Sequence, residues 1–457
     1  MGILEKLDTA SRIPLSMQQD FLCLFDKGDE AGPFGPRYHI VDGWRLRGRL
    51  DVDALRSALD DVVARHEALR TTIVRGDDVR YQEVMPPGSP ALVIGDIGGT
   101  GSRDIRAEEF LNAVEAETID ARELPVLRAV VGRFDDRDAV LVLVVHHTAA
   151  DAWSMHVIMR DLAVCYARRR GHDVPDLPEV VQYREFAIHQ RASAGDAAEA
   201  RARGYWRDEL RGAEIVAIAT DHPTDPNRSA DASFYTGWHR FVYETQLRAA
   251  TAQLASAMRS SPFMVLLAAF AVFVNRMTGA TDVVTPTFMP GRGQRRMQNT
   301  VGSFFNFVPL RIDLAGCATF RDVVERARAT CLGAYAHEVP LALVLQEAPG
   351  LMRPVAEAGR VPCVFQVVQS PFMLDRDVVG DVEYSSIWRR TLSQPVGSDI
   401  PDGMLWSLQL GPTDDIVGQL GFSSSLFDGG TVTAMVAEFR RVLGEVVAAP
   451  DAPLSGI

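Results

Sequence analysis

The segment HHTAADAWS, residues 146–154, holds the residue types that acid–base chemistry needs. Its two histidines follow an apolar run, residues 141–145, that is typical of a strand buried on both faces. Because neighbouring strand residues point to opposite faces, one histidine is expected to face a cleft and the other the core. Asp151 precedes a predicted helix, so the free backbone N–H groups at the positive helix end lie near both rings. A base beside such N–H groups is what acyl transfer requires.

Three plainer interpretations also fit this segment when it is taken alone. A histidine pair can bind metal, but no further His, Cys or carboxylate lies at a standard ligand spacing such as HExxH. Both histidines can be core residues with satisfied hydrogen bonds, and Asp151 can be a helix cap and nothing more. The dipeptide by itself does not decide between these interpretations.

The elements that must position the segment follow from the spacing of apolar residues. Asp51 is predicted to cap a helix with an apolar stripe, and a second amphipathic helix follows Asp151 and ends near Gly171. Further helices are predicted at residues 183–210 with an interruption near Gly195, at 264–276 and at 431–446. Strands are predicted at residues 44–50, 69–74, 141–145, 282–287, 304–312, 364–368 and 419–423. Helices alternating with strands in both parts indicate an α/β or mixed α+β fold.

Further motifs stand in order along the chain. They are SRIPLSMQQ (11–19), RHEALRTTI (65–73), YREFAIHQ (183–190), PGR (290–292), VGSFFNFVPLR (301–311) and, more loosely, HEVP (337–340) and SSSLFD (423–428). Together with HHTAADAWS they resemble the motif series of the condensation domains of nonribosomal peptide synthetases, whose signature is HHxxxDG. The resemblance covers residues 11–447.

This resemblance implies a fold of two chloramphenicol-acetyltransferase-like lobes, arranged as a V-shaped pseudo-dimer around a central tunnel. A polar stretch, residues 171–182, contains Pro175 and Pro178 and is typical of a linker. We therefore expect an N-terminal lobe at residues 1–177, which carries HHTAADAWS, and a C-terminal lobe at 178–457.

The resemblance also implies roles for individual residues. It places the active-site histidine at His147, makes His146 structural, and pairs Asp151 with an arginine, for which Arg65 and Arg70 are the candidates. The substrate or oxyanion region is expected at Ala152, Trp153, Ser154 and Asn306. A neutral imidazole, with an unperturbed pKa of about 6.5, can take the proton of an amine or hydroxyl that attacks a thioester. A hydroxyl acceptor needs this help more than an amine does.

Two residues depart from the family pattern. Ala152 stands where the signature has glycine, so the N–H group is kept but a positive φ would be strained. We expect a right-handed or extended backbone there, or a slightly shifted loop. Pro286 removes one donor from its strand, which predicts an edge position for that strand.

The activity that the resemblance implies is acyl transfer in natural-product biosynthesis. An acyl or aminoacyl group would pass from the phosphopantetheine thioester of a carrier protein to a small-molecule or carrier-bound alcohol or amine, giving an ester or amide. No adenylation or thioesterase region fits in 457 residues, so a freestanding condensation enzyme is expected, similar to those of enediyne antibiotic pathways. A catalytically silent recruitment module and a CoA-dependent acyltransferase are the alternatives, and the intact histidines argue against the first. No bound cofactor or metal is expected.

Composition and charge exclude several other classes. The net charge of −13 gives no dominant basic field for nucleic acid, and no apolar run reaches the ~18 residues of a membrane helix. The start of the chain does not resemble a signal peptide, and the five cysteines form no CxxC pair. A cytoplasmic protein with reduced thiols is the simplest expectation.

Carrier proteins are usually acidic as well, so a carrier protein and this chain repel each other through their net charges. Docking must overcome that repulsion locally. A local basic patch is therefore predicted, and two clusters qualify. The first comprises Arg168, Arg169 and Arg170, and the second comprises Arg292, Arg295 and Arg296. The first cluster can equally serve only to neutralise the C-terminal end of its helix.

Overall fold

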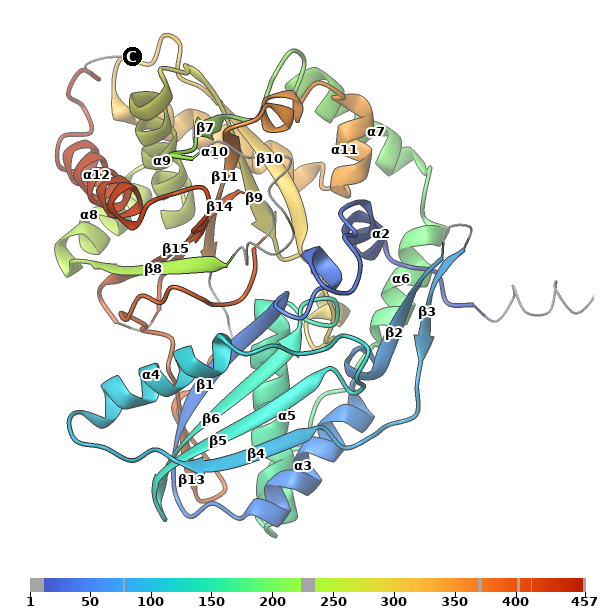
Figure 1. Cartoon of the computed structure of the whole chain (residues 1–457). Coiled ribbons are helices and arrows are strands. Elements are labelled where there is room, and N and C mark those ends of the chain that lie inside the picture. Colours follow the sequence, from blue (N-terminus) through green and yellow to red (C-terminus); the bar gives the residue numbers. More distant parts are fainter. Residues whose placement is uncertain are drawn as a thin grey trace, which may run out of the picture.

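Two sheets organise the protein into two lobes, which lie one above the other in Figure 1. The structure, a computed structural model, describes residues 12–76, 79–222, 235–368, 372–400, 403–411 and 413–454. The first lobe is built on a six-stranded sheet of order β12-β13-β1-β6-β5-β4, and the second on a five-stranded sheet of order β7-β11-β14-β15-β8. This mixed architecture confirms the expected fold class.

The central strand of the first sheet is the one that leads to the histidines. The strands of this sheet are β1 (His39–Arg47), β4 (Ala91–Asp96), β5 (Leu127–Asp135), β6 (Asp138–His146), β12 (Asp375–Val379) and β13 (Val382–Ser386). Helices α3 (Val52–Arg65) and α5 (Ala152–Arg169) cover one face, and α4 (Arg103–Glu115) covers the other. Residues 139–146 of β6 are all buried, because side chains on both of its faces pack under helices. The predicted doubly buried strand is therefore confirmed.

The second lobe is assembled around a helix that is apolar on every side. Its sheet has β7 (Ala217–Ala219), β8 (Thr236–Tyr243), β11 (Arg360–Val368), β14 (Met404–Gln409) and β15 (Ile416–Ser423), and β9 (Asp282–Met289) pairs with β10 (Asn306–Asp313) beside it. Its helices are α8 (Thr245–Ala257), α9 (Pro262–Thr278), α10 (Phe320–Ala336), α11 (Leu341–Glu347) and α12 (Gly429–Ala448).

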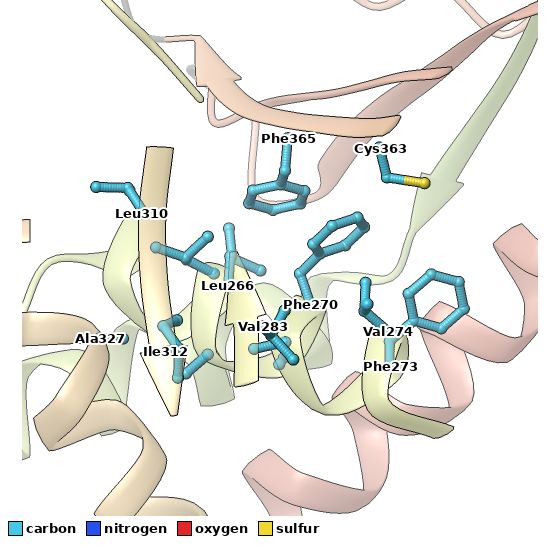
Figure 2. Close-up of a cluster of buried hydrophobic side chains, with 14 of the residues drawn as sticks. Leu266, Phe270, Phe273, Val274, Val283, Leu310, Ile312, Ala327, Cys363 and Phe365 are labelled. Atoms are coloured by element: carbon cyan, nitrogen blue, oxygen red, sulfur yellow. The ribbon is translucent and has the colours of Figure 1, made fainter. Parts of the chain in front are cut away.

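Helix α9 forms the middle of this second core. Residues 264–275 of α9 are all buried, which explains why its sequence shows no polar face. Figure 2 shows Phe270 of α9 against Phe365 of β11, with ring centres 4.5 Å apart, and Phe273 further along α9. Leu310 of β10 belongs to the same cluster. Ser261 caps the helix at its start and Gly279, at φ +74°, ends it.

The remaining elements connect or flank the lobes. They are α2 (Met17–Leu24), β2 (Thr71–Arg75), β3 (Arg80–Val84), α6 (Tyr183–Ala192), α7 (Ala197–Glu209) and the 3₁₀ turns Gly32–Phe34, Glu67–Arg70, Arg295–Met297 and Arg353–Ala356. The break between α6 and α7 confirms the predicted interruption near Gly195. Among the described residues no single helix is long and apolar enough to span a membrane, although α8 and α9, bent by 108° to each other, reach that length and apolarity as a pair.

Chain from the second half of the sequence completes the first sheet. Strand β13 pairs with β1, from Trp44 opposite Ser386 to Arg47 opposite Glu383, and β12 pairs with β13. The predicted division at residues 177/178 falls in the coil between α5 and α6. The structure adds that residues 375–386 cross this division and belong to the first sheet.

One expectation about strands differs in detail from the structure, and another is confirmed. The predicted strand at residues 44–50 begins earlier, at His39, because β1 pairs with β6 along its whole length, from His39 opposite His146. Pro286 lies opposite Pro309 in the two-stranded β9–β10 ladder, and β9 has no strand ladder on its other edge among the described residues. The predicted edge position at Pro286 is thus confirmed.

Candidate active site

Asp151 caps helix α5 and thereby fixes the loop that carries the histidines. Its Oδ1 atom accepts hydrogen bonds from the backbone N–H of Ser154 at 2.8 Å and from the Ser154 hydroxyl at 2.7 Å. An aspartate is favoured at this position because it satisfies a helix N–H group that has no partner within the helix. The capping role predicted for Asp151 is present, but it is only part of what this residue does.

The arginine that pairs with Asp151 is Arg292, from the second lobe. The guanidinium binds both carboxylate oxygens, with Nη1 2.5 Å from Oδ2 and Nη2 2.9 Å from Oδ1, and both side chains are buried. The prediction of Arg65 or Arg70 as the partner is wrong. Arg65 binds Asp161 instead, and Arg70 donates to the backbone carbonyls of Val63 and Met85.

Ser154 and a loop of the second lobe complete this contact. The Ser154 hydroxyl lies 2.9 Å from Nη2 of Arg292 and 3.1 Å from the backbone N–H of Gly302, and the N–H of Phe304 donates to Oδ2 of Asp151 at 3.2 Å. We call Asp151, Ser154, Arg292 and the backbone of residues 300–304 the interlobe clasp. Because Ser154 is fully buried and engaged in the clasp, its predicted place in the substrate region is wrong.

Two glycines allow the chain to approach closely at the clasp. A Cβ atom on Gly302 would lie 2.0 Å from Cδ2 of Tyr183, and one on Gly291 would lie 2.1 Å from the carbonyl oxygen of Phe304. Gly291 also has a φ of +61°, which disfavours any residue with a side chain. These positions belong to the PGR and VGSFFN motifs, so part of the signal in those motifs is steric.

His147 is held by its backbone, by one ring nitrogen and by two aromatic rings. Its N–H donates to the carbonyl of Tyr38, and Nδ1 lies 2.8 Å from the carbonyl oxygen of Ala150. The imidazole stacks on Tyr38, with ring centres 4.9 Å apart, and meets the edge of Phe305 at 5.3 Å. A carbonyl oxygen only accepts, so Nδ1 carries the proton and Nε2 keeps its lone pair.

The protonation state of His147 follows from its surroundings. Burial lowers the pKa of His147 below its ordinary value, and the nearby Asp151 carboxylate offsets this only in part. The ring is therefore neutral at pH 7. Within the described chain no group donates to Nε2 or accepts from it, so this lone pair is free to take a proton from a substrate.

His146 occupies the opposite face of the strand end and is fully buried. Its Nδ1 lies 2.8 Å from the Thr148 hydroxyl and its Nε2 lies 3.1 Å from the carbonyl oxygen of Gly35. Burial lowers the pKa of His146 to about 4. With both nitrogens occupied, His146 holds two loops together, which is the structural role expected for it.

The other predicted substrate residues fall into two groups. Ala152 begins α5 in a right-handed helical conformation, as expected for an alanine in this place, and the backbone N–H groups of Ala152 and Trp153 make no hydrogen bond to any described residue. The Trp153 indole donates to the carbonyl of Gln298. Asn306 is buried, and its amide donates to the carbonyl of Val339 at 2.9 Å. This contact makes Asn306 a support for the chain at residues 338–339.

A series of phenylalanine rings, which no sequence motif indicated, connects the surface to His147. The ring of Phe305 contacts Phe288 at 5.6 Å, Phe288 contacts Phe307 at 5.2 Å, and Phe307 contacts Phe21 at 6.5 Å. Phe21 then meets Phe25, which is 42% exposed. We call these five residues the aromatic series. They come from α2 and the residue after it, from β9, and from β10 and the residue before it, so no single sequence window contains them.

The predicted docking arginines are not equivalent in the structure. Arg292 is buried in the clasp and cannot contact a carrier protein, so that part of the prediction is wrong. Each arginine of the first cluster has an acidic partner: the pairs are Arg168 with Asp176, Arg169 with Asp61, and Arg170 with Asp381. Arg295 and Arg296 are exposed. No group of His, Cys, Asp or Glu suited to a metal ion occurs in the described part of the chain.

Comparison with known proteins identifies the family. The condensation-domain family model matches residues 33–457. The crystal structure of SgcC5 from Streptomyces globisporus, in complex with (R)-(-)-1-(2-naphthyl)-1,2-ethanediol and sucrose, is 48% identical with a TM-score of 0.92, and the match covers 96% of this chain and 100% of that one. The X-domain from teicoplanin biosynthesis is 26% identical with a TM-score of 0.76, over 98% of this chain and 97% of that one.

Curated relatives give the same result. The probable non-canonical nonribosomal peptide synthetase CymA of Salinispora arenicola is 33% identical over 99% of this chain. The match covers 6% of that synthetase, and the chain spans less than a tenth of the curated relatives it matches first. The protein therefore belongs to the condensation-domain family. Condensation domains are acyltransferases that form amide or ester bonds.

Proposed function

We propose that this protein transfers an acyl or aminoacyl group from the phosphopantetheine thioester of a carrier protein to a hydroxyl group, with His147 as the base. The observation that carries the proposal is the unprotonated Nε2 of a neutral, fixed imidazole beside the start of α5. No resident cofactor is required, because the donor brings its own phosphopantetheine.

In the proposed reaction, His147 accepts one proton and later returns it. Nε2 of His147 takes the proton of the acceptor hydroxyl while its oxygen attacks the thioester carbonyl and forms the new C–O bond. The tetrahedral intermediate then expels the thiolate as the C–S bond breaks, and the imidazolium returns the proton to that sulfur. We propose the free N–H groups of Ala152 and Trp153 as donors to the negative oxygen of the intermediate.

The aromatic series supports the proposal that the hydroxyl-bearing acceptor substrate is an apolar molecule. The five rings, from the exposed Phe25 to Phe305 beside His147, favour stacking with a flat unsaturated molecule. The relative SgcC5 was crystallised with a naphthyl-substituted vicinal diol, which combines both features. We therefore propose an ester product, and an antibiotic pathway of the enediyne kind as the setting.

One relative supports a second candidate function, the docking of a partner enzyme. The X-domain from teicoplanin biosynthesis has been crystallised in complex with OxyB, so a condensation fold of that kind can dock a partner enzyme. The free Nε2 of His147 favours catalysis in this chain over docking alone. A CoA thioester donor instead of a carrier-bound one is the other alternative, and the assay below separates them.

A single-turnover transfer assay tests the proposal. An acyl group loaded on a carrier protein, or on CoA, is offered with 1-(2-naphthyl)-1,2-ethanediol, and ester formation is followed by mass spectrometry. We expect carrier-dependent ester formation that falls by ~10²–10⁴-fold in His147→Ala, because general-base help has that size.

The control is His222→Ala, which removes a histidine from the surface. Equal rates in wild type and His147→Ala would contradict the catalytic role. Faster transfer from CoA than from the carrier would replace the proposed donor.

A further inference from the structure

Asp42, on the first lobe, forms no salt bridge with an arginine or lysine among the described residues, although the charge of Arg390 acts on it from a distance. Asp42 lies on β1, and no side chain or backbone group of the described residues makes a hydrogen bond to its carboxyl group. Three other buried acidic side chains are held by arginines: Asp151 by Arg292, Asp161 by Arg65 and Arg160, and Glu115 by Arg240 and Arg390. A fourth, Glu108, accepts hydrogen bonds from the backbone N–H groups of Thr391 and Leu392. The nitrogen nearest to the Asp42 carboxyl is Nε2 of His156, at 3.8 Å.

His156 does not supply the missing charge. Burial lowers the pKa of His156 to about 4, so its imidazole is neutral at pH 7. Its Nδ1 is buried and has no hydrogen-bond partner. The edge of the ring faces Trp44, whose indole N–H is also buried and unpaired. Asp42 and His156 thus form a polar pair with unused hydrogen-bonding capacity inside an otherwise apolar face.

The Asp42 side of this pair is open to solvent, while the His156 side chain is largely covered. The side chain of Asp42 is 36% exposed, although it stands between strands of a sheet covered by helices. The reason lies in the sheet: β13 pairs with β1 only from Trp44 onward, so β1 loses that neighbour at Asp42. The surroundings nevertheless disfavour a charge on this carboxyl group: burial raises the pKa of Asp42 to about 7, the Glu115 carboxylate adds to this, and the charge of Arg390 offsets it only in part.

The pair lies on the same face of the sheet as the core beneath α5, at a short distance from His147. Asp42 is three residues along β1 from His39, which is paired with His146, so it lies about 10 Å along the strand from the histidines. Residues two apart on a strand share a face, which places Asp42 with Ile40 and Trp44 and therefore under α5. His156 is on the second turn of that same helix.

We propose that Asp42, with His156, binds the protonated amino group of a substrate whose reacting atom lies at His147. An alkylammonium has three donors and a full positive charge. The two carboxylate oxygens and the lone pair of a neutral imidazole provide three acceptors for it. The cation would also supply the charge that Asp42 lacks in the free protein. This inference rests on the proposed function and adds the residues that select for an amine-bearing substrate, Asp42 and His156.

The amine can belong to the acyl donor or to the acceptor, and the test has one arm for each. The donor arm uses two pairs of loaded carrier proteins, with one diol as acceptor. One pair carries 3-aminobutanoyl and butanoyl groups, and the other carries 6-aminohexanoyl and hexanoyl groups. The acceptor arm compares 1-phenyl-1,2-ethanediol with its 4-aminomethyl derivative, with butanoyl carrier as donor. Wild type is compared with Asp42→Asn, and Asp136→Asn, in the exposed turn between β5 and β6, is the control with the same loss of charge.

We expect Asp42→Asn to lower kcat/KM by about 10- to 100-fold for the amine-bearing member of one pair, the usual loss when a hydrogen bond to a charged group is removed. The kcat/KM for the amine-free member of the same pair should change less than threefold. His156→Gln should show the same selectivity with a smaller loss, which guards against misfolding of one variant. The pair that responds identifies the source of the amine.

Two results would overturn the inference. Asp42→Asn could leave every pair unchanged, or it could slow amine-bearing and amine-free substrates equally. If transfer of the amine-free donors still depends on His147 in either case, the proposed function stands and only this inference fails. If wild type transfers none of the donors, the proposed function fails and this inference fails with it.

Discussion

At the scale of single residues, Asp151 and Arg292 make the contact with the largest expected effect on stability. Removing one member of a buried ion pair leaves the other charge without compensation, at a cost of about 3–5 kcal/mol. We expect Asp151→Ala to lower the free energy of unfolding by that amount, measured by urea denaturation. Asp61→Ala, which breaks the surface pair with Arg169, should change it by less than about 1 kcal/mol.

A double variant separates the pair from its surroundings. Arg292→Met combined with Asp151→Ala should be less destabilised than the sum of the two single variants, because no unpaired charge remains. An Asp151→Ala protein as stable as wild type but inactive in transfer would assign this residue to the chemistry instead of the fold.

The sequence could predict the types of residue at the site but not all of their partners. His147, His146 and Asp151 stand within six residues, and strand and helix geometry places them together. Arg292 is 141 residues away from Asp151, so nothing local in the chain indicates their contact. The role predicted for Ser154 is wrong for the same reason, since the groups that occupy its hydroxyl belong to Arg292 and Gly302.

At the scale of elements, the turn around Gly291 controls how β9 leads into the clasp. A Cβ atom there would collide with the carbonyl of Phe304, and the positive φ adds strain. We expect Gly291→Ala to lower the free energy of unfolding by about 2–4 kcal/mol, because overpacking and a strained φ each cost about 1–3 kcal/mol. Gly293→Ala is the matched control, since nothing lies within 4 Å of its added Cβ. Equal stability of the two variants would mean that the turn relaxes freely.

Elements with a clear apolar period were predictable, and elements that depend on distant pairing were not. The stripe after Asp51 gave helix α3 to within a few residues, and the break near Gly195 separated α6 from α7. Strand β13, by contrast, joins a sheet formed by residues more than 200 positions earlier. Its sequence, VEYSS, shows a strand preference but carries no information about which sheet it enters.

At the scale of the whole molecule, the exposed arginines near the clasp are the remaining candidates for carrier docking. We predict that the double variant Arg295→Glu/Arg296→Glu raises the KM for the carrier protein and leaves kcat nearly unchanged, because exposed charges act mainly on encounter. The effect should fade at 1 M salt, where the Debye length is about 3 Å. Arg56→Glu/Arg201→Glu makes the same change in charge on other exposed surfaces. A similar KM in both double variants would contradict docking at this patch.

The pH dependence of stability is also a property of the whole molecule, because several histidines are buried as neutral rings. Burial lowers the pKa of His39, His66, His146, His147 and His156. The unfolded chain takes up these protons near pH 6.5, before the folded protein does, so stability falls as the pH falls below that value. For His146 alone, a pKa of about 4 corresponds to a loss of about 3 kcal/mol between pH 6.5 and 4.

The acidic groups modify this trend without reversing it. Asp42, with its pKa raised to about 7, takes up a proton earlier when folded and so gains stability toward low pH. Glu115 and Asp161, with pKa values lowered to about 2, lose stability below about pH 4.5. Urea denaturation at pH 7.5, 6 and 5 should therefore give decreasing free energies of unfolding. A constant or rising value would show that the buried histidines do not govern the acid response.

The return of residues 375–386 to the first sheet also sets an order of events during protein synthesis. A ribosome adds about 5–20 residues per second, and roughly 335 residues separate Arg47 from Val382, so β1 emerges tens of seconds before the strand that pairs with its outer edge. Through that interval the nascent chain presents an open strand edge, the kind of surface on which chains aggregate. The first lobe can thus be completed only after β13 has emerged from the ribosome. A slower translation rate would lengthen the period in which the open edge of β1 needs protection by chaperones.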